Sequence, residues 1–235
     1  MADIRVITLD LDNTLWDVDS VIIRAEAQMK DWLQEHAAEV LTLYTPEQLA
    51  PLRERVLEEY SDKRHDLTFM RVQMLTELGM LAGHDAEQAR NIAQQAFDVF
   101  FVGRNQVQFF EGALDMLADV SSHLPVYALT NGNADIQRAG IGHLLQGAFS
   151  SADVGVSKPH QDMFHTPLKK LGYQPEQAIH IGDNLVDDIH GAKQSGLYSI
   201  WVNLKNAVLA ETDPLPDREV QHLDQVLSAV HSIID

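Results

Sequence analysis

The 235-residue chain contains no cysteine. Disulfide bonds, thiolate zinc sites and cysteine nucleophiles are therefore excluded. Basic side chains are also scarce, because 17 lysines and arginines stand against 35 aspartates and glutamates, giving a formal net charge of −18. A surface that binds nucleic acid needs clustered lysine and arginine, so we expect no nucleic-acid partner.

Long apolar runs are missing as well. No run approaches the roughly 20 residues that a membrane-spanning helix needs, and the first residues lack the basic and then apolar pattern of a signal peptide. We therefore expect a cytoplasmic protein without a membrane partner, present as a monomer or homodimer. Hydrophobic residues make up 45% of the chain, which is enough to fill a substantial core.

A series of helices is predicted between about Val18 and Phe101, where apolar residues recur at helical spacing. Ser20 is a plausible N-cap for the first of them, and Gly79 is expected to stop the third. The predicted helices cover Ser20–Val40, a segment that starts near Thr45, Leu67–Leu78 and Asp85–Phe101. Together they indicate a small helical bundle.

After Phe110 the chain alternates between strands and helices, which implies a parallel sheet covered on both faces. Strands are predicted at Val126–Leu129, Ala148–Ser150, Ala178–Ile181 and Tyr198–Val202, and helices at Gly112–Ser121, Ala134–Leu145, Gln161–Leu171, Val186–Ser195 and Gln221–Ile233. The apolar segment Ile4–Leu9 must join this sheet, since alone it could not bury its side chains. We therefore predict an α/β core of residues 1–16 and 106–235, interrupted by a helical domain of residues 17–105.

Two aspartates follow the first apolar segment, in the run Asp10-Leu11-Asp12-Asn13-Thr14. Residues two apart in a strand point to the same face, so Asp10 and Asp12 would face the same space. Two adjacent carboxylates repel each other unless a cation or a proton lies between them. The pair is therefore a candidate for metal binding combined with acid–base chemistry.

Three later segments place polar groups at the ends of strands or loops. They are Thr130-Asn131-Gly132, Ser157-Lys158-Pro159 and Gly182-Asp183-Asn184-Leu185-Val186-Asp187-Asp188. Ligands of open parallel sheets bind beyond the carboxyl ends of the strands, so these segments are expected to meet near Asp10. Each segment alone is weak, but the four in this order are specific.

These four segments resemble the motifs of the haloacid dehalogenase superfamily, and the resemblance covers the whole chain. That family is marked by Asp-x-Asp-x-Thr, a Thr or Ser after the second motif strand, a lysine, and a Gly-Asp motif followed by a further aspartate. The resemblance implies a Rossmann-like parallel sheet, with the helical insertion acting as a C1-type cap that would select the substrate.

The resemblance also implies catalytic roles. Asp10 would be the nucleophile that forms an aspartyl-phosphate, and Asp12 the general acid and then base. Mg²⁺ would be held by the Asp10 carboxylate, the Asp12 carbonyl and Asp183. Lys158 would neutralise the phosphoryl group.

The remaining core positions follow from the same motifs. The Thr130 hydroxyl and the N–H groups of Asn131 and Gly132 would bind phosphoryl oxygens. Asp188 is expected to be the second acidic residue of the last motif, orienting the lysine or metal-bound water, with Asp187 as the alternative.

The resemblance favours a phosphatase, since a dehalogenase releases halide without needing an acid at Asp12. Phosphatases of FMN and of 5-amino-6-(5-phosphoribitylamino)uracil, from riboflavin metabolism, have similar segments. A sugar phosphomutase, a phosphatase of sugar or nucleotide phosphates, and a regulator without turnover remain alternatives. Trp16, which could stack on a flat ring, and Arg71, in the insertion beside His65 and Thr68, are candidate substrate-binding residues. His180 is predicted to be a packed core residue.

Overall fold

The structure is a computed structural model that describes residues 2–235. These residues divide into two compact units. Unit 1 holds the residues up to Asp17 together with Gln108–Asp235, and unit 2 holds Val18–Val107. The sequence predicted these boundaries after residues 16 and 105, each within two residues of the observed ones.

Unit 1 is built on a sheet that contains, within residues 2–235, six strands in the order β3-β2-β1-β4-β5-β6. All five pairings are parallel. The strands are β1 (Val6–Leu9), β2 (Val126–Thr130), β3 (Gly147–Ser150), β4 (Ala178–Gly182), β5 (Tyr198–Val202) and β6 (Arg218–Val220). Every residue of β1 and β4 is buried, as expected for central strands covered on both faces. The predicted α/β fold class is confirmed.

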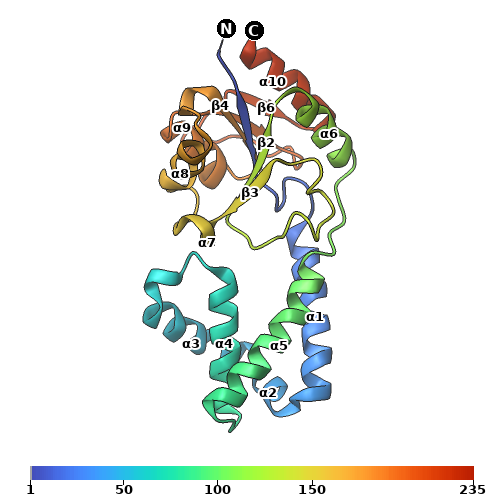
Figure 1. Ribbon diagram of the computed structural model, residues 1–235, viewed down its shortest axis with the longest axis vertical. Coiled ribbons are helices and arrows are strands. Elements are labelled where there is room, and N and C mark those ends of the chain that lie inside the picture. The colour runs from blue at the N-terminus through green and yellow to red at the C-terminus, as the bar shows by residue number, and fades with distance from the viewer. Residues whose placement is uncertain (1) are drawn as a thin grey trace. The chain divides into compact units, whose positions relative to one another are not determined.

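Helices cover both faces of this sheet: α8 and α9 lie on one side of it, α6 and α10 on the other (Figure 1). The helices of unit 1 are α6 (Ala113–His123), α7 (Ser151–Val154), α8 (Asp162–Leu171), α9 (Gly191–Gln194) and α10 (Val226–Ile234), with the 3-10 turns η2 (Pro175–Gln177) and η4 (Leu223–Gln225). A single turn of π-helix, η3 (Leu185–His190), precedes α9. The helix predicted over Val186–Ser195 is thus two short, different turns.

One other prediction for unit 1 is wrong, and one strand was missed. The segment predicted as a helix, Ala134–Leu145, forms turns. The Asp135 carboxylate accepts hydrogen bonds from the N–H groups of Gln137 and Arg138, and Gly140 adopts a left-handed conformation with φ of 84°. Both features favour turns over a continuing helix. The sequence did not predict the short strand β6, only one of whose three residues is buried.

Unit 2 is helical and has its own apolar core, which includes Met29, Leu33, Val56, Leu78 and Phe100. Its elements are α1 (Val18–His36), α2 (Ala38–Leu43), α3 (Pro46–Glu59), η1 (Ser61–Lys63), α4 (Leu67–Leu81) and α5 (Ala86–Arg104). None of the helices formed by residues 2–235 has the length and apolar character needed to cross a bilayer.

Two details of unit 2 differ from expectation. Ser20 lies inside the first turn of α1, which begins at Val18, so it is not the N-cap. Gly79 does not end α4, because the helix continues to Leu81. A Cβ at Gly79 would lie 2.9 Å from the Cβ of Ala89, so this glycine permits the close approach of α4 and α5.

Candidate active site

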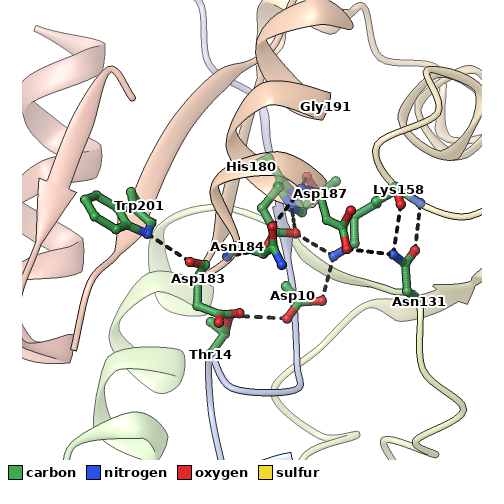
Figure 2. A network of polar contacts seen from close by, with 12 residues as sticks. Asp10, Thr14, Asn131, Lys158, His180, Asp183, Asn184, Asp187, Gly191 and Trp201 are labelled. Carbon is green, nitrogen blue, oxygen red and sulfur yellow. Dashed lines mark hydrogen bonds and ion pairs between the residues drawn. The ribbon is translucent and has the colours of Figure 1, made fainter. Parts of the chain in front are cut away.

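Asp10 follows the central strand β1 directly, and its side chain is one-tenth exposed. The Lys158 ammonium, itself 2% exposed, donates to Asp10 Oδ1 at 2.6 Å. Figure 2 shows Asp10 between Lys158 and Thr14, with Asp183 beyond Thr14. Residues 148 positions apart in the chain therefore meet, as expected for loops at the carboxyl edge of a parallel sheet.

A second carboxylate, Asp188, holds Lys158 from the other side at 2.6 Å. The same Asp188 Oδ1 lies 3.0 Å from His180 Nε2, and Asp188 Oδ2 accepts from the N–H of Asn184 at 2.9 Å. Asp187 is only half-buried and lies 3.4 Å from the Asn131 amide nitrogen. Asp188, rather than Asp187, is therefore the partner of the lysine.

Asp183 faces the opposite oxygen of Asp10. The Thr14 hydroxyl lies 3.3 Å from both Asp10 Oδ2 and Asp183 Oδ1. One hydroxyl carries one proton, so it can donate to only one of these two oxygens at a time. The carbonyl of Asp183 accepts from the Trp201 indole at 2.8 Å, which fixes the loop that carries the carboxylate.

The loops after β2 and before α8 are joined by a pair of hydrogen bonds. The Asn131 amide donates to the carbonyl of Lys158 at 3.0 Å, and its Oδ1 accepts from the N–H of Lys158 at 2.7 Å. The Gly132 N–H, expected to face substrate, donates to Thr130 Oγ1 at 2.9 Å. Thr130 is buried and keeps its own hydroxyl proton for another acceptor.

Trp16 is placed differently from the expectation of a ring open to substrate. Its side chain is fully buried, and the ring packs edge-on against Phe109, with ring centroids 5.6 Å apart. The indole nitrogen donates to Asp12 Oδ1 at 2.8 Å. The buried ring cannot stack on a ligand, but it holds the carboxylate of the candidate general acid.

Arg71 lies on α4 of unit 2, where other side chains already engage it. It donates to Glu26 at 3.1 Å, and its guanidinium lies over the Phe100 ring, 3.8 Å from the centroid. Burial, with the Glu26 charge adding to it, raises the pKa of nearby Tyr44. The expected role of Arg71 in substrate binding stays a prediction.

Charge is unevenly balanced around Asp10. Burial raises the pKa of Asp10 to about 8; Lys158 opposes this rise, and Asp188 and Asp183 add to it. Burial, assisted by Asp188, also raises the pKa of Asp183 to about 6. Burial would raise the pKa of Asp188 too, but Lys158 and His180 hold it well below its usual range. One ammonium group, that of Lys158, thus serves both Asp188 and Asp10, and Asp183 adds a third carboxylate, so the cluster of three carboxylates lacks positive charge.

A divalent cation would supply the positive charge that these carboxylates lack. Carboxylate oxygens of Asp10, Asp183 and Asp188 all lie within 4.8 Å of one another. Both oxygens of Asp188 accept hydrogen bonds of their own, whereas Asp10 Oδ2 and Asp183 Oδ1 share the single proton of the Thr14 hydroxyl. Asp10 and Asp183 are therefore the better carboxylate ligands. Hard oxygen donors of this kind suit Mg²⁺. The residues present therefore fit the predicted metal.

Unit 1 also has a pocket of about 1130 Å³ at the end of the sheet, and Asp183 forms part of its wall. Its lining includes Asn13, Asn184, Trp201 and Asp224. The Asp183 side of the site therefore borders this pocket.

Two positioning residues were not identified from the sequence. His180 is fully buried, as predicted, and in addition its Nδ1 lies 2.8 Å from the Thr8 hydroxyl and its Nε2 lies 3.0 Å from Asp188 Oδ1. Gly182 lets Asp188 approach, since a Cβ there would lie 2.3 Å from the Asp188 carboxyl carbon. The signals were the alternation along β4, which puts positions 180 and 182 on one face, and the glycine itself.

Known proteins resemble this chain along its whole length. Residues 4–196 match the haloacid dehalogenase-like hydrolase family. A 5-amino-6-(5-phospho-D-ribitylamino)uracil phosphatase of Escherichia coli K12, YigB, is 30% identical over 233 residues, which cover 98% of each chain. The N-acylneuraminate-9-phosphatase of Rattus norvegicus is 25% identical over 242 residues, covering 99% of this chain and 96% of the relative.

A solved structure is similar as well. The crystal structure of a protein described as 2-haloacid dehalogenase from Pseudomonas syringae pv. Tomato DC3000 matches with a TM-score of 0.93 and 34% identity. The match covers 98% of this chain and 99% of that one.

Proposed function

We infer that this chain uses Mg²⁺ and forms an aspartyl-phosphate on Asp10. The chain belongs to the haloacid dehalogenase-like hydrolase family and is a phosphoric monoester hydrolase. One observation carries the proposal. Asp10, the buried Lys158 ammonium at 2.6 Å and the Asp183 carboxylate converge at the end of the central strand, next to the Asp12 loop. This arrangement supplies a nucleophile, a fixed cation and a cation site together.

The reaction follows from these groups. The Asp10 carboxylate attacks phosphorus and forms an O–P bond while the bond from phosphorus to the ester oxygen breaks. Asp12 gives its proton to the departing oxygen. Asp12, now a carboxylate, then takes a proton from water as that water attacks the acyl phosphate, which releases inorganic phosphate and restores Asp10.

Charge neutralisation is the main task of the surrounding residues. Lys158 offsets part of the phosphoryl charge, and the Thr130 hydroxyl has a proton to donate to a phosphoryl oxygen. Asp10, Asp183 and the carbonyl of Asp12 would hold Mg²⁺, which when bound supplies the positive charge that lets an anionic nucleophile approach an anionic ester.

The substrate that we propose is a small phosphorylated metabolite. The full-length similarity to YigB supports 5-amino-6-(5-phospho-D-ribitylamino)uracil, and FMN has the same ribityl-phosphate end. The similarity to the N-acylneuraminate-9-phosphatase keeps sugar phosphates as an alternative. A sugar phosphomutase would use the same intermediate but return the phosphoryl group to a sugar oxygen.

Halide removal is the second candidate, because the similar crystal structure is described as a dehalogenase. A halide leaves carbon without needing a proton, so such an enzyme has no use for an acid at position 12. Here the Asp12 carboxylate is held by a hydrogen bond from a buried tryptophan. That hydrogen bond favours phosphate ester hydrolysis.

The test measures phosphate release from 4-nitrophenyl phosphate, FMN, the ribitylaminouracil phosphate and a panel of sugar and nucleotide phosphates. Each assay is run with Mg²⁺ and with a chelator, and Asp10→Asn is the control. We expect activity with Mg²⁺ only and a loss of roughly 10³-fold or more in Asp10→Asn. Full activity of Asp10→Asn would refute the proposal, and halide release from a 2-haloacid without phosphate release would favour the second candidate.

A further inference from the structure

Trp16 and Asp12 form a closed turn whose shape is fixed by the backbone. The N–H of Asn13 donates to the carbonyl of Trp16 at 2.7 Å, and the N–H of Leu15 donates to the carbonyl of Leu11 at 2.9 Å. Asn13 takes the left-handed conformation, with φ of 61°. The chain therefore folds back on itself and brings the Trp16 indole to the Asp12 carboxylate.

The far side of this turn is anchored to the rest of unit 1. The N–H of Phe110 donates to the carbonyl of Leu15 at 2.8 Å, and Trp16 forms an antiparallel bridge with Phe109. The Phe109 ring meets the indole at 77°. A fully buried ring held in this way has little freedom to rotate, so its N–H group has a fixed direction.

An indole is a hydrogen-bond donor only. Its N–H points at Asp12 Oδ1, so Oδ1 must accept in both protonation states of the carboxyl group. In a protonated carboxyl group the hydroxyl oxygen is the weaker acceptor, so the hydrogen bond from the indole favours the proton on Oδ2. The neutral indole N–H is compatible with both the acid and the carboxylate, which the two halves of the proposed reaction require in turn.

We propose that Trp16 is a positioning residue that holds the Asp12 carboxyl through Oδ1, so that Oδ2 alone exchanges a proton with the leaving oxygen. The inference rests on the proposed function. In the first step the proton moves from Asp12 Oδ2 to the ester oxygen as its bond to phosphorus breaks and the bond from Asp10 to phosphorus forms. In the second step Oδ2 takes a proton from the attacking water.

The test depends on the leaving group. An alkoxide is a poor leaving group and needs the proton from Asp12, whereas 4-nitrophenolate leaves readily without it. Trp16→Phe keeps an aromatic ring but lacks the N–H. The quantity to compare is kcat/KM, because it reports the steps up to formation of the phosphoenzyme and not its later hydrolysis.

We expect Trp16→Phe to lose roughly tenfold in kcat/KM on alkyl phosphates and much less on 4-nitrophenyl phosphate. Phe109→Leu is the matched control, because it loosens the packing of the same ring but leaves the N–H in place. Because the N–H can still reach Asp12 in this variant, its losses on the two substrate classes should differ far less than those of Trp16→Phe. An equal loss on both classes in Trp16→Phe, or no loss on either, would overturn the inference.

A second variant covers the case in which Trp16→Phe does not fold. Replacement of Trp16 by 3-benzothienylalanine keeps the shape of the ring and removes only the N–H donor, and the same selective loss on alkyl phosphates is expected. The proposed function fails separately, if the wild-type protein releases phosphate from no ester. If the wild-type protein is active and the Trp16 variants lose the same factor on both substrate classes, only the role of Trp16 is rejected.

Discussion

The two oxygens of Asp10 have opposite surroundings. Oδ1 contacts Lys158, which the protein holds permanently between two carboxylates, whereas Oδ2 faces Asp183 across a shared Thr14 hydroxyl. On the lysine side the chain itself supplies a cation. On the Asp183 side two carboxylates lack a cation, and the pKa values of both are raised, mainly by burial.

The cation on the lysine side is therefore supplied by folding, whereas the cation on the Asp183 side must come from a bound ligand. Removing charge on the lysine side leaves buried carboxylates without their partner, which is costly. Removing charge on the Asp183 side relieves repulsion in the metal-free protein. The same kind of substitution should therefore have opposite effects on stability on the two sides, although both sides are needed for activity.

The largest effect is expected from Lys158→Met. It leaves Asp10 and Asp188 buried without a cation, so the free energy of unfolding should fall by about 3–5 kcal/mol. Activity should fall by roughly 10²- to 10³-fold. Urea unfolding and phosphate release measure the two effects.

Lys193→Met is the matched control for that experiment. Lys193 also pairs with an aspartate, Asp217, at 2.7 Å, but its side chain is 40% exposed. Loss of such a surface pair should cost at most about 1 kcal/mol and leave activity intact. Equal costs for the two lysine variants would contradict the contrast between buried and exposed pairs.

Asp183→Asn tests the other side of the comparison. We expect the metal-free protein to be as stable as wild type or more stable, because one of two repelling carboxylates is gone. Activity at a fixed Mg²⁺ concentration should fall by roughly 10²-fold, with a higher Mg²⁺ requirement. Mg²⁺ titrations of activity and urea unfolding in a chelator are the measurements.

Asp187→Asn is the control for Asp183→Asn, since Asp187 contacts Asn131 and not Asp10. Its Mg²⁺ requirement should match that of wild type. If Asp183→Asn destabilised the metal-free protein as strongly as Lys158→Met, the proposed lack of positive charge on this side would be wrong.

The pH dependence of stability follows from the same asymmetry. Unfolded aspartates have a pKa of about 4, whereas the folded pKa values are about 8 for Asp10 and about 6 for Asp183. Between these values the folded metal-free protein binds more protons than the unfolded chain, so its stability falls as pH rises. Asp188, whose pKa is lowered, and Lys158, whose pKa is raised, keep their charges across this range.

Urea unfolding at about pH 6 and about pH 8 in a chelator measures this slope. Excess Mg²⁺ binds the ionised carboxylates, so its stabilising effect should be larger at the higher pH. Stability that rises with pH in the chelator would contradict the prediction.

The smallest effect is expected at His180, which supports Asp188 from within the sheet. His180→Leu leaves the Asp188 carboxylate without one buried donor, and we expect a loss of about 1–3 kcal/mol in the free energy of unfolding. His180→Gln retains an N–H near the position of Nε2 and should recover part of that loss. No difference between the two variants would show that the hydrogen bond to Asp188 is not needed.

Much of the site could be predicted from the sequence, because parallel strands bring their carboxyl ends to one edge. That rule alone brought Asp10, Asn131, Lys158 and Asp183 together. The sequence favoured Asp188 over Asp187 but did not exclude Asp187. The chain there forms a π-type turn, in which the Ile189 N–H reaches the carbonyl of Asn184, and such a turn changes which side chain faces inward.

The missed features depend on contacts between distant segments. The partner of His180, Thr8, lies 172 residues away, and only the register of β1 against β4 brings them together. Trp16 lies where the chain leaves the core and was a candidate to stack on a substrate ring, but a left-handed Asn13 turns the chain back. Gly79 was expected to end its helix, but this glycine instead permits the close approach of a neighbouring helix. No local pattern encodes these three contacts.

The most direct test of the account traps the intermediate on Asp10. The protein is mixed with Mg²⁺ and substrate and quenched in acid, then treated with borohydride, which reduces an acyl phosphate to an alcohol. Asp12→Asn, which should slow hydrolysis of the intermediate, increases the trapped fraction. We predict homoserine at position 10 by peptide mass spectrometry; an unmodified Asp10 in samples that release phosphate, or modification of another carboxylate, would contradict the account.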